Sequence, residues 1–186
     1  MVLITITEVI YLLITTLVIG YIFSGFTTKF RGIDYFKKFN LSDFKLSILV
    51  AAPGIILHEL SHKFVAMFFG LTAQFQMFTF GLILGTILKF FNSPLIILAP
   101  GYVGIGGNTT ELTMTLIAFA GPLINLILWI SVHYVLKYKN LGRKQAIFFL
   151  LTKEVNKWLF IFNMLPIPPL DGSKVWFGLY HLIFST

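Results

Sequence analysis

The sequence contains no cysteine and few charged residues, and each absence excludes a class of protein. Without cysteine the chain has no disulfide framework and no thiol nucleophile, so any bound metal must use histidine and carboxylate. Charged residues make up 11% of the chain, against about 25% in a typical soluble domain. Hydrophobic residues make up 57% and the mean hydropathy is +0.88, which indicates an integral membrane protein.

The net charge of +7 does not point to nucleic acid, because the basic residues are spread over short loops and form no single patch. In a membrane protein, an excess of Lys and Arg in short loops marks the cytoplasmic side. A chain of 186 residues has room for about four to six spans and little else. We therefore expect one integral membrane domain over residues 1–186, with its core at 46–175, in contact with the lipid bilayer and not with nucleic acid.

Apolar runs predict an all-α polytopic fold with about four transmembrane helices, since a span needs roughly 20 apolar residues. The fourth run is amphipathic in its first half, which we expect to line a cavity or lie near the membrane interface. A final apolar run is too short to cross alone and is expected to be a partial helix, unless the natural chain continues. The predicted spans are Leu3–Phe23, Leu46–Phe69, Leu112–Leu136 and Ala146–Leu165, and the short C-terminal segment is Val175–Phe184.

The stretch from Gly70 to Asn108 is apolar but rich in glycine and proline, and it lacks the pattern of one helix. Part of it, Gln74 to Met77, alternates polar and apolar residues with the period of a strand. We expect a small re-entrant or β-hairpin region here, between the second and third helices. A strand edge at membrane depth must face protein or a wet cavity. Such an edge either receives an extended peptide by strand addition or only covers the helices, and the sequence leaves both interpretations open.

The second predicted span contains the run His58 to His62, which reads His-Glu-Leu-Ser-His. Residues four apart lie on one face of an α-helix, so both imidazoles can bind one metal ion while Glu59 acts as a general base. From the composition, this motif is expected by chance only about 0.002 times. Charged residues inside a span are also unfavourable, by about 2.5 to 3.5 kcal/mol each, and are functional by default. A purely structural cluster of hydrogen-bonding histidines is the alternative.

A hydrolytic zinc site needs a third protein ligand and an open position. Asp171 is the candidate, because it follows three prolines in the four positions from Pro166 to Pro169. Such irregular backbone at membrane depth is tolerated where it faces a cavity. The alternative is an ordinary turn, with an Asp before a Gly at a helix end. Asn163 precedes the same prolines, and its uncharged amide can donate to a developing oxyanion.

Together these motifs resemble the site-two protease family of intramembrane zinc metalloproteases. The resemblance rests on His58 to His62 in the second span, Gly121 to Asn125 in the third, and Asn163 to Gly172 near the fourth. Pro100 to Val103 is also similar to the family's loop before its third helix. The resemblance covers about residues 46 to 175, and the motifs occur in the family's order. Any one of them alone would be weak.

The resemblance implies a metalloprotease that cuts peptide bonds in the transmembrane helices of membrane-protein substrates, in regulated intramembrane proteolysis. It also implies Zn²⁺ as the cofactor. About 40 residues separate the second and third spans and little follows the last motif, so we expect a minimal member without peptide-binding or nucleotide-sensing modules. The residues carried over are His58, His62 and Asp171 as metal ligands, Glu59 and Asn163 as catalytic residues, and Asn125 as support for substrate or structure.

Two other functions are compatible with these residues. A divalent-metal transporter also carries His and acidic residues at membrane depth, but it needs several polar spans, and the first span here offers only Glu8. A catalytically silent scaffold could keep the metal ligands but has no need of Glu59. Two further features have structural interpretations, His133 as an interhelical hydrogen bonder and Glu154 with Lys157 as an ion pair. Glu8 has no assigned role.

Loop charge predicts the orientation. The connection Ser24 to Asp43 and the one after Leu136 are both basic and fall on one side, which we expect to be cytoplasmic. His58 lies about 18 Å into its predicted helix. We therefore expect an active site that opens toward the cytoplasmic side, in the cell membrane of a prokaryote. The sequence does not predict the substrate, the cleavage position or the oligomeric state.

Overall fold

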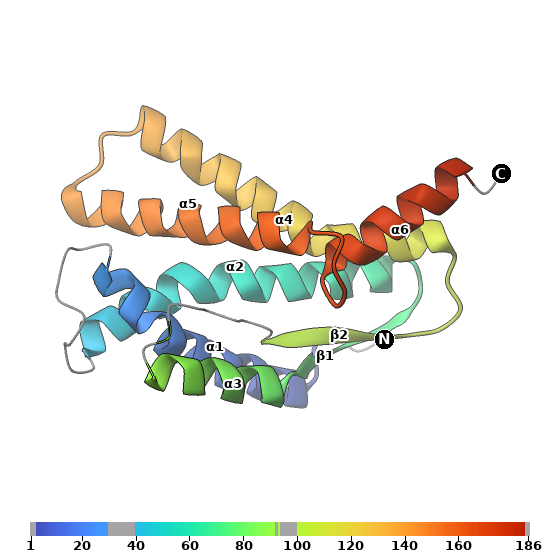
Figure 1. Cartoon of the computed structure of the whole chain (residues 1–186), viewed down its shortest axis with the longest axis horizontal. Coiled ribbons are helices and arrows are strands. Elements are labelled where there is room, and N and C mark those ends of the chain that lie inside the picture. Colours follow the sequence, from blue (N-terminus) through green and yellow to red (C-terminus); the bar gives the residue numbers. More distant parts are fainter. Residues whose placement is uncertain (1–2, 30–39, 92, 94–99, 185–186) are drawn as a thin grey trace.

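The chain is mostly helical. The computed structural model describes residues 3–29, 40–91, 93 and 100–184, without the side chains of 25–29. In these residues, helices dominate and two strands lie between the second and fourth helices (Figure 1). The elements are α1 (Ile6–Lys29), α2 (Leu41–Phe68), β1 (Thr72–Met77), α3 (Thr79–Phe90), β2 (Gly101–Gly106), α4 (Glu111–Tyr138), α5 (Arg143–Asn163) and α6 (Asp171–Phe184).

Among the described residues, three helices are long and apolar enough to cross a membrane: α1 over Ile6–Ser24, α2 and α4. They correspond to the first three predicted spans, and they support a helical membrane protein. The fourth predicted span, Ala146–Leu165, does form α5, but α5 is not one of the three. Charged residues in its first half make it too polar. The predicted count of four spans is therefore not confirmed.

The single acidic residue of α5, Glu154, is paired with two of its lysines. Glu154 Oε2 lies 2.6 Å from Lys157 Nζ, which confirms the predicted ion pair, and Glu154 Oε1 lies 3.3 Å from Lys153 Nζ. Burial raises the pKa of Glu154, but the hydrogen bonds from the two lysines outweigh it and hold the pKa below its usual range. Glu154 is therefore ionised at neutral pH and has a structural role as the partner of two lysines.

Helix α2 lies at the centre of the fold and contacts α1, α4 and α5 (Figure 1). One buried core joins α2 to α1 and α5, and it ends one turn before His58. This packing fixes the helix that carries the His-Glu-Leu-Ser-His motif. The core consists of Ile19, Val50, Ala51, Ile55, Leu151 and Val155.

Helix α2 also begins earlier than predicted. Its N-cap is Asn40, whose side-chain oxygen accepts a hydrogen bond from the Ser42 N–H at 2.8 Å. The segment from Ser24 to Asp43, expected to be a polar connection, is therefore helical at both ends, and residues 30–39 lie outside the described part. His58 consequently lies about 26 Å from the start of its helix, not the predicted 18 Å.

Strands β1 and β2 form a two-stranded antiparallel sheet in which Phe75 lies opposite Val103. The strand predicted at Gln74 to Met77 is confirmed. The prediction missed α3, so the two strands are joined through a helix and not by a tight hairpin. Glycines with positive φ flank this region: Gly70, at +77°, follows α2, and Gly107, at +122°, follows β2.

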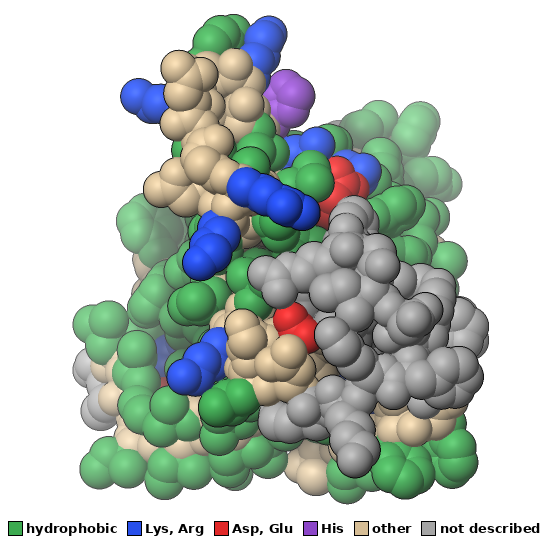
Figure 2. Space-filling model, turned by 90° about the vertical axis from the view of Figure 1, so that its left-hand side faces the viewer, with side chains coloured by type: hydrophobic (Ala, Val, Ile, Leu, Met, Phe, Trp, Pro, Cys, Tyr) green, Lys and Arg blue, Asp and Glu red, His purple; other side chains and the backbone are tan. Residues whose placement is uncertain are grey.

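The basic connection between α4 and α5 and the predicted metal ligands lie toward opposite ends of the molecule. The basic residues Lys139 and Arg143 lie in or next to the α4–α5 connection, and Figure 2, which faces this end, shows Lys and Arg side chains among apolar ones. The pocket beside the predicted ligands is lined instead by Met114 and Ile117, near the start of α4. Loop charge predicts that the basic end of the molecule is cytoplasmic. A site that opens to the cytoplasm would instead put the opposite end there, so the two parts of the predicted orientation disagree.

Candidate metal centre

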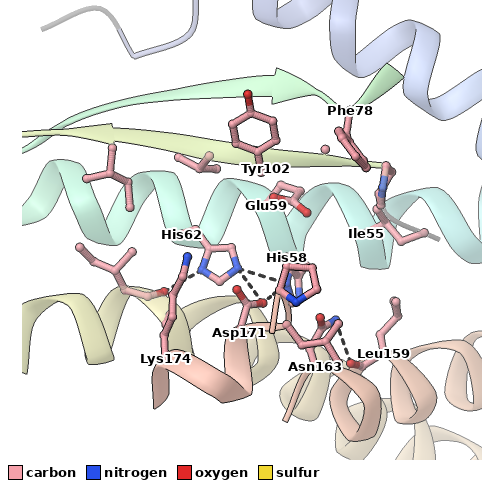
Figure 3. Close-up of a pocket in the computed structure, with 18 of the residues that line it drawn as sticks. Ile55, His58, Glu59, His62, Phe78, Tyr102, Leu159, Asn163, Asp171 and Lys174 are labelled. Carbon is pink, nitrogen blue, oxygen red and sulfur yellow. Dashed lines mark hydrogen bonds and ion pairs between the residues drawn. The ribbon is translucent and has the colours of Figure 1, made fainter. Parts of the chain in front are cut away.

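The predicted metal ligands come together from two helices. His58 and His62 lie one turn apart on α2, and both are buried, with Nε2 atoms 3.1 Å from each other. Asp171 is the first residue of α6, and its Oδ2 lies 2.9 Å from His58 Nε2 and 3.3 Å from His62 Nε2 (Figure 3). Among the described residues, these three form the group that could hold a metal ion.

The outer nitrogens of both imidazoles are fixed by acceptors. His62 Nδ1 lies 2.7 Å from the carbonyl oxygen of Ile117 on α4. His58 Nδ1 lies 2.6 Å from Asn125 Oδ1, and the Asn125 amide nitrogen donates to the Gly54 carbonyl at 3.0 Å. Because a backbone carbonyl can only accept, the orientation of the Asn125 amide is determined, and so is the proton on each Nδ1.

These bonds leave two unprotonated nitrogens facing a carboxylate oxygen. With each neutral imidazole carrying its proton on Nδ1, the lone pairs of His58 Nε2 and His62 Nε2 point at each other and at Asp171. Three such atoms repel one another, and a proton or a metal cation between them relieves the repulsion. Zinc prefers His nitrogen and carboxylate oxygen at about 2.0 to 2.1 Å, which places tetrahedral ligands about 3.4 Å apart. The donor set and the separations of 2.9, 3.1 and 3.3 Å fit that ion.

A glycine on α4 leaves room for the two imidazoles. A Cβ atom at Gly121 would lie 2.6 Å from His58 Nε2, which is closer than Cβ atoms come to other heavy atoms in proteins. The run from Gly121 to Asn125 thus has two physical functions in this structure. Its first residue permits the close approach of α4 to the ligands, and its last residue orients His58.

Helix α6 is held in place by α4 and by the end of α5, which positions Asp171. The Trp176 indole N–H donates to the Met164 carbonyl at 2.8 Å. Gly178 lies against Thr115 of α4, where no side chain would fit. The peptide bond between Pro168 and Pro169 is cis, within the turn that leads to Asp171.

Glu59 and Asn163 line a pocket of about 450 Å³ beside the ligands. Glu59 is 9% exposed and follows His58 on α2. Asn163 is the last residue of α5, and its Nδ2 donates to the Leu159 carbonyl at 3.0 Å, so one amide N–H is held within its own helix. The structure thus brings both predicted catalytic residues to the pocket, and their roles stay predictions.

One residue of the site was missed by the sequence analysis. Asn156 on α5 is 1% exposed, its Oδ1 accepts from Asn125 Nδ2 at 3.0 Å, and its own Nδ2 donates to the Thr152 carbonyl at 2.9 Å. The signal available in the sequence was a polar Asn within the predicted span Ala146–Leu165. The remaining histidines lie elsewhere. His133 is exposed beside Tyr134, and His181 Nδ1 lies 3.7 Å from Glu111 Oε2.

We expect Asn125→Ala to lower the zinc affinity about 10- to 100-fold, the usual effect of losing a partner that orients a ligand. The His58 imidazole would lose the acceptor that fixes its tautomer. Competition with a chelator of known affinity measures the change. Asn140→Ala, at an exposed position after α4, is the matched control. An unchanged affinity in Asn125→Ala would show that the packing of α4 alone orients His58.

Comparison with known proteins then decides the family. A protein of Methanocaldococcus jannaschii, named "Putative zinc metalloprotease MJ0611", is 36% identical over 169 residues, which cover 90% of this chain and 82% of that protein. The chain belongs to this zinc metalloprotease family. A protein of Bacillus subtilis named "Putative zinc metalloprotease YwhC" is 29% identical over 166 residues, covering 77% of this chain and 73% of that protein.

Membership of this zinc metalloprotease family agrees with the geometry of the site. The predicted zinc cofactor is confirmed by these relatives together with the group formed by His58, His62 and Asp171. The predicted class, a metallopeptidase, is supported by the same relatives. No family model matches the chain, and no solved structure matches it.

Proposed function

We propose that this protein is a site-two type intramembrane protease, which hydrolyses peptide bonds in the transmembrane helices of membrane proteins. One observation carries the proposal. His58, Glu59 and His62 lie on α2, a helix apolar and long enough to cross a membrane, and they border a pocket of about 450 Å³. This position of the metal ligands supports hydrolysis at membrane depth.

The residues of the pocket suit peptide hydrolysis. His58, His62 and Asp171 would hold the zinc ion, which would supply Lewis-acid chemistry at the site. Glu59 accepts a proton from the attacking water and passes it to the leaving amine. Asn163 has a second amide N–H beyond the one bonded to Leu159, and this N–H can donate to the oxyanion.

The sheet offers one edge on which an extended substrate can dock. Strand β2 lines the pocket with Gly101, Tyr102, Val103 and Ile105, and no third strand pairs with it in the described residues. A substrate helix hides its carbonyls in hydrogen bonds and must unwind before attack. Pairing with β2 by strand addition would hold it unwound, so the proposed partners are transmembrane segments of other membrane proteins.

The transporter alternative finds no support in the site. Glu8, the acidic residue of α1, is paired with the buried Lys63 and is not among the residues that line the pocket. The scaffold alternative leaves Glu59 without a function.

Cleavage by the purified protein tests the proposal. Zinc-loaded protein in detergent should cleave a panel of model transmembrane substrates, lose this activity with a chelator and regain it with added zinc. If no substrate is cleaved while zinc still binds stoichiometrically, the protease assignment fails. Zinc uptake into proteoliposomes would then be measured.

The orientation can be tested by cysteine labelling, because the native chain has no cysteine. We propose that the basic end is cytoplasmic, as loop charge predicts. A membrane-impermeant maleimide should then label Asn108→Cys in intact cells and leave Lys139→Cys unlabelled until the cells are opened. Both positions are exposed and lie at opposite ends of α4. The reverse pattern would place the pocket end on the cytoplasmic side.

A further inference from the structure

Away from the metal centre, a carboxylate and an ammonium group are buried together. Glu8 on α1 and Lys63 on α2 are each 1% exposed, and Glu8 Oε1 lies 2.5 Å from Lys63 Nζ. Removing two charges from water is unfavourable, so such a pair is stable only where further hydrogen bonds satisfy it. Neither group takes part in the chemistry proposed above.

The Glu8 carboxylate joins three elements of the fold. Its Oε1 also accepts a hydrogen bond from the Phe75 N–H of β1 at 2.8 Å. Its Oε2 accepts from the Thr5 N–H at 2.8 Å, while the Glu8 N–H donates to Thr5 Oγ1 at 3.3 Å, which makes a capping box for α1. One side chain therefore ties the first turn of α1 to α2 and to the backbone of β1.

Strand β1 in turn determines where β2 lies. The Phe75 side chain is 1% exposed, and its ring lies so close to Gly101 that a Cβ there would come within 2.6 Å of Phe75 Cζ. Gly101 lines the pocket. At the other end of the linkage, Lys63 directly follows His62. The bonds of Glu8 thus join the residue next to a metal ligand to β1, the strand that pairs with the pocket-lining β2.

We propose that Glu8 is a positioning residue for substrate. By holding β1 against α2, it fixes the position of the β2 edge relative to the metal ligands and Glu59. This inference rests on the proposed function, because it takes β2 as the strand on which substrate docks. It also makes α1 part of the proteolytic unit, although the resemblance at the level of sequence begins only at residue 46. A substrate paired to a displaced β2 would bind less tightly, and the metal would be unaffected.

Two double variants differ in the oxygen that can accept from the Phe75 N–H, and both lose the second carboxylate oxygen, which accepts from the Thr5 N–H. Glu8→Gln with Lys63→Met removes both charges but keeps a carbonyl oxygen for the Phe75 N–H. Glu8→Leu with Lys63→Met removes both charges and that oxygen. Both are expected to fold, since replacing a buried ion pair by neutral groups of similar volume is often neutral or stabilising. For each variant, KM, kcat and zinc affinity are measured, together with hydrogen exchange of the β1 amides.

In the leucine variant, relative to the glutamine variant, we expect KM to rise at least about fivefold and the β1 amides to exchange faster by a similar factor, the effect of one buried hydrogen bond. Zinc affinity and kcat should stay the same. Equal KM values and equal exchange in the two variants would overturn the proposal and leave the pair a stabilising contact only.

Hydrogen exchange keeps the test independent of proteolysis. If the native protein cleaves nothing, the proposed function fails, while unequal exchange in the two variants would still support the positioning of β1 by Glu8. If the leucine variant does not fold, the native chain decides. Its Phe75 N–H donates to Glu8, and the inference requires that this amide be as protected as the amides of α2. Rapid exchange there would overturn it.

Discussion

Glu59→Gln should bind zinc like the native protein and cleave substrate about 10²- to 10⁴-fold more slowly, the range typical of a lost general base. Glutamine keeps the size of the side chain but cannot accept a proton from water. Zinc should stay bound because Glu59 is not part of the group formed by His58, His62 and Asp171. Single-turnover cleavage at equal zinc content, verified by metal analysis, gives the rate of the chemical step.

Glu154→Gln is the matched control for this substitution. It makes the same chemical change in a carboxylate of α5 that is paired with Lys153 and Lys157 and does not line the pocket. We expect its cleavage rate to stay within about threefold of the native rate, since it removes a partly exposed ion pair. If Glu59→Gln retained cleavage within the same limit, another group would have to accept the proton, and the proposed role of Glu59 would be wrong.

Asp171→Asn should weaken zinc binding by more than about 100-fold, because the loss of an outer partner alone weakens it 10- to 100-fold. The amide oxygen keeps the shape of the ligand but not its charge. The two imidazoles remain fixed by Asn125 and Ile117, so residual binding is expected. Zinc affinity is measured by chelator competition, without reference to cleavage.

The response to added zinc separates this variant from Glu59→Gln. Cleavage by Asp171→Asn should recover partly at high zinc concentration, whereas cleavage by Glu59→Gln should not. Glu111→Gln, at an exposed carboxylate in the first turn of α4, is the control. Native affinity in Asp171→Asn would mean that the third ligand is another group.

Local spacing made the α2 part of the site predictable, since His58 and His62 need only one turn of helix to meet. Asp171 was predicted from a different signal, the prolines before it, and the structure brings it to the same point although it follows His58 by 113 residues. Both signals lie in side chains or in proline, which the sequence displays directly.

The contacts that orient the ligands could not be predicted in this way. One acceptor is the backbone carbonyl of Ile117, and every residue has such a group, so nothing marks it in the sequence. Asn156 acts through Asn125, and only the packing of α5 against α4 brings the two together. Helix α3 was missed because glycines at its start suggested irregular chain.

Glu8 illustrates a missed local signal. Thr5 and Glu8 have the spacing of a capping box before an apolar run, which predicts the start of a helix. That pattern explains one oxygen of the carboxylate. The other oxygen bonds to Lys63 and Phe75, which lie more than 50 residues away, and no local pattern predicts such partners.

The separation of the ligands along the chain has a consequence for synthesis in the cell. Helices α2 and α4, which supply the two imidazoles and the acceptors Asn125 and Ile117, leave the ribosome before α6, which supplies Asp171. Until α6 docks on α4, the ligand set is incomplete and affinity for zinc is low. The metal site is thus completed only by the last described helix of the chain, after both helices that fix the imidazoles have been made.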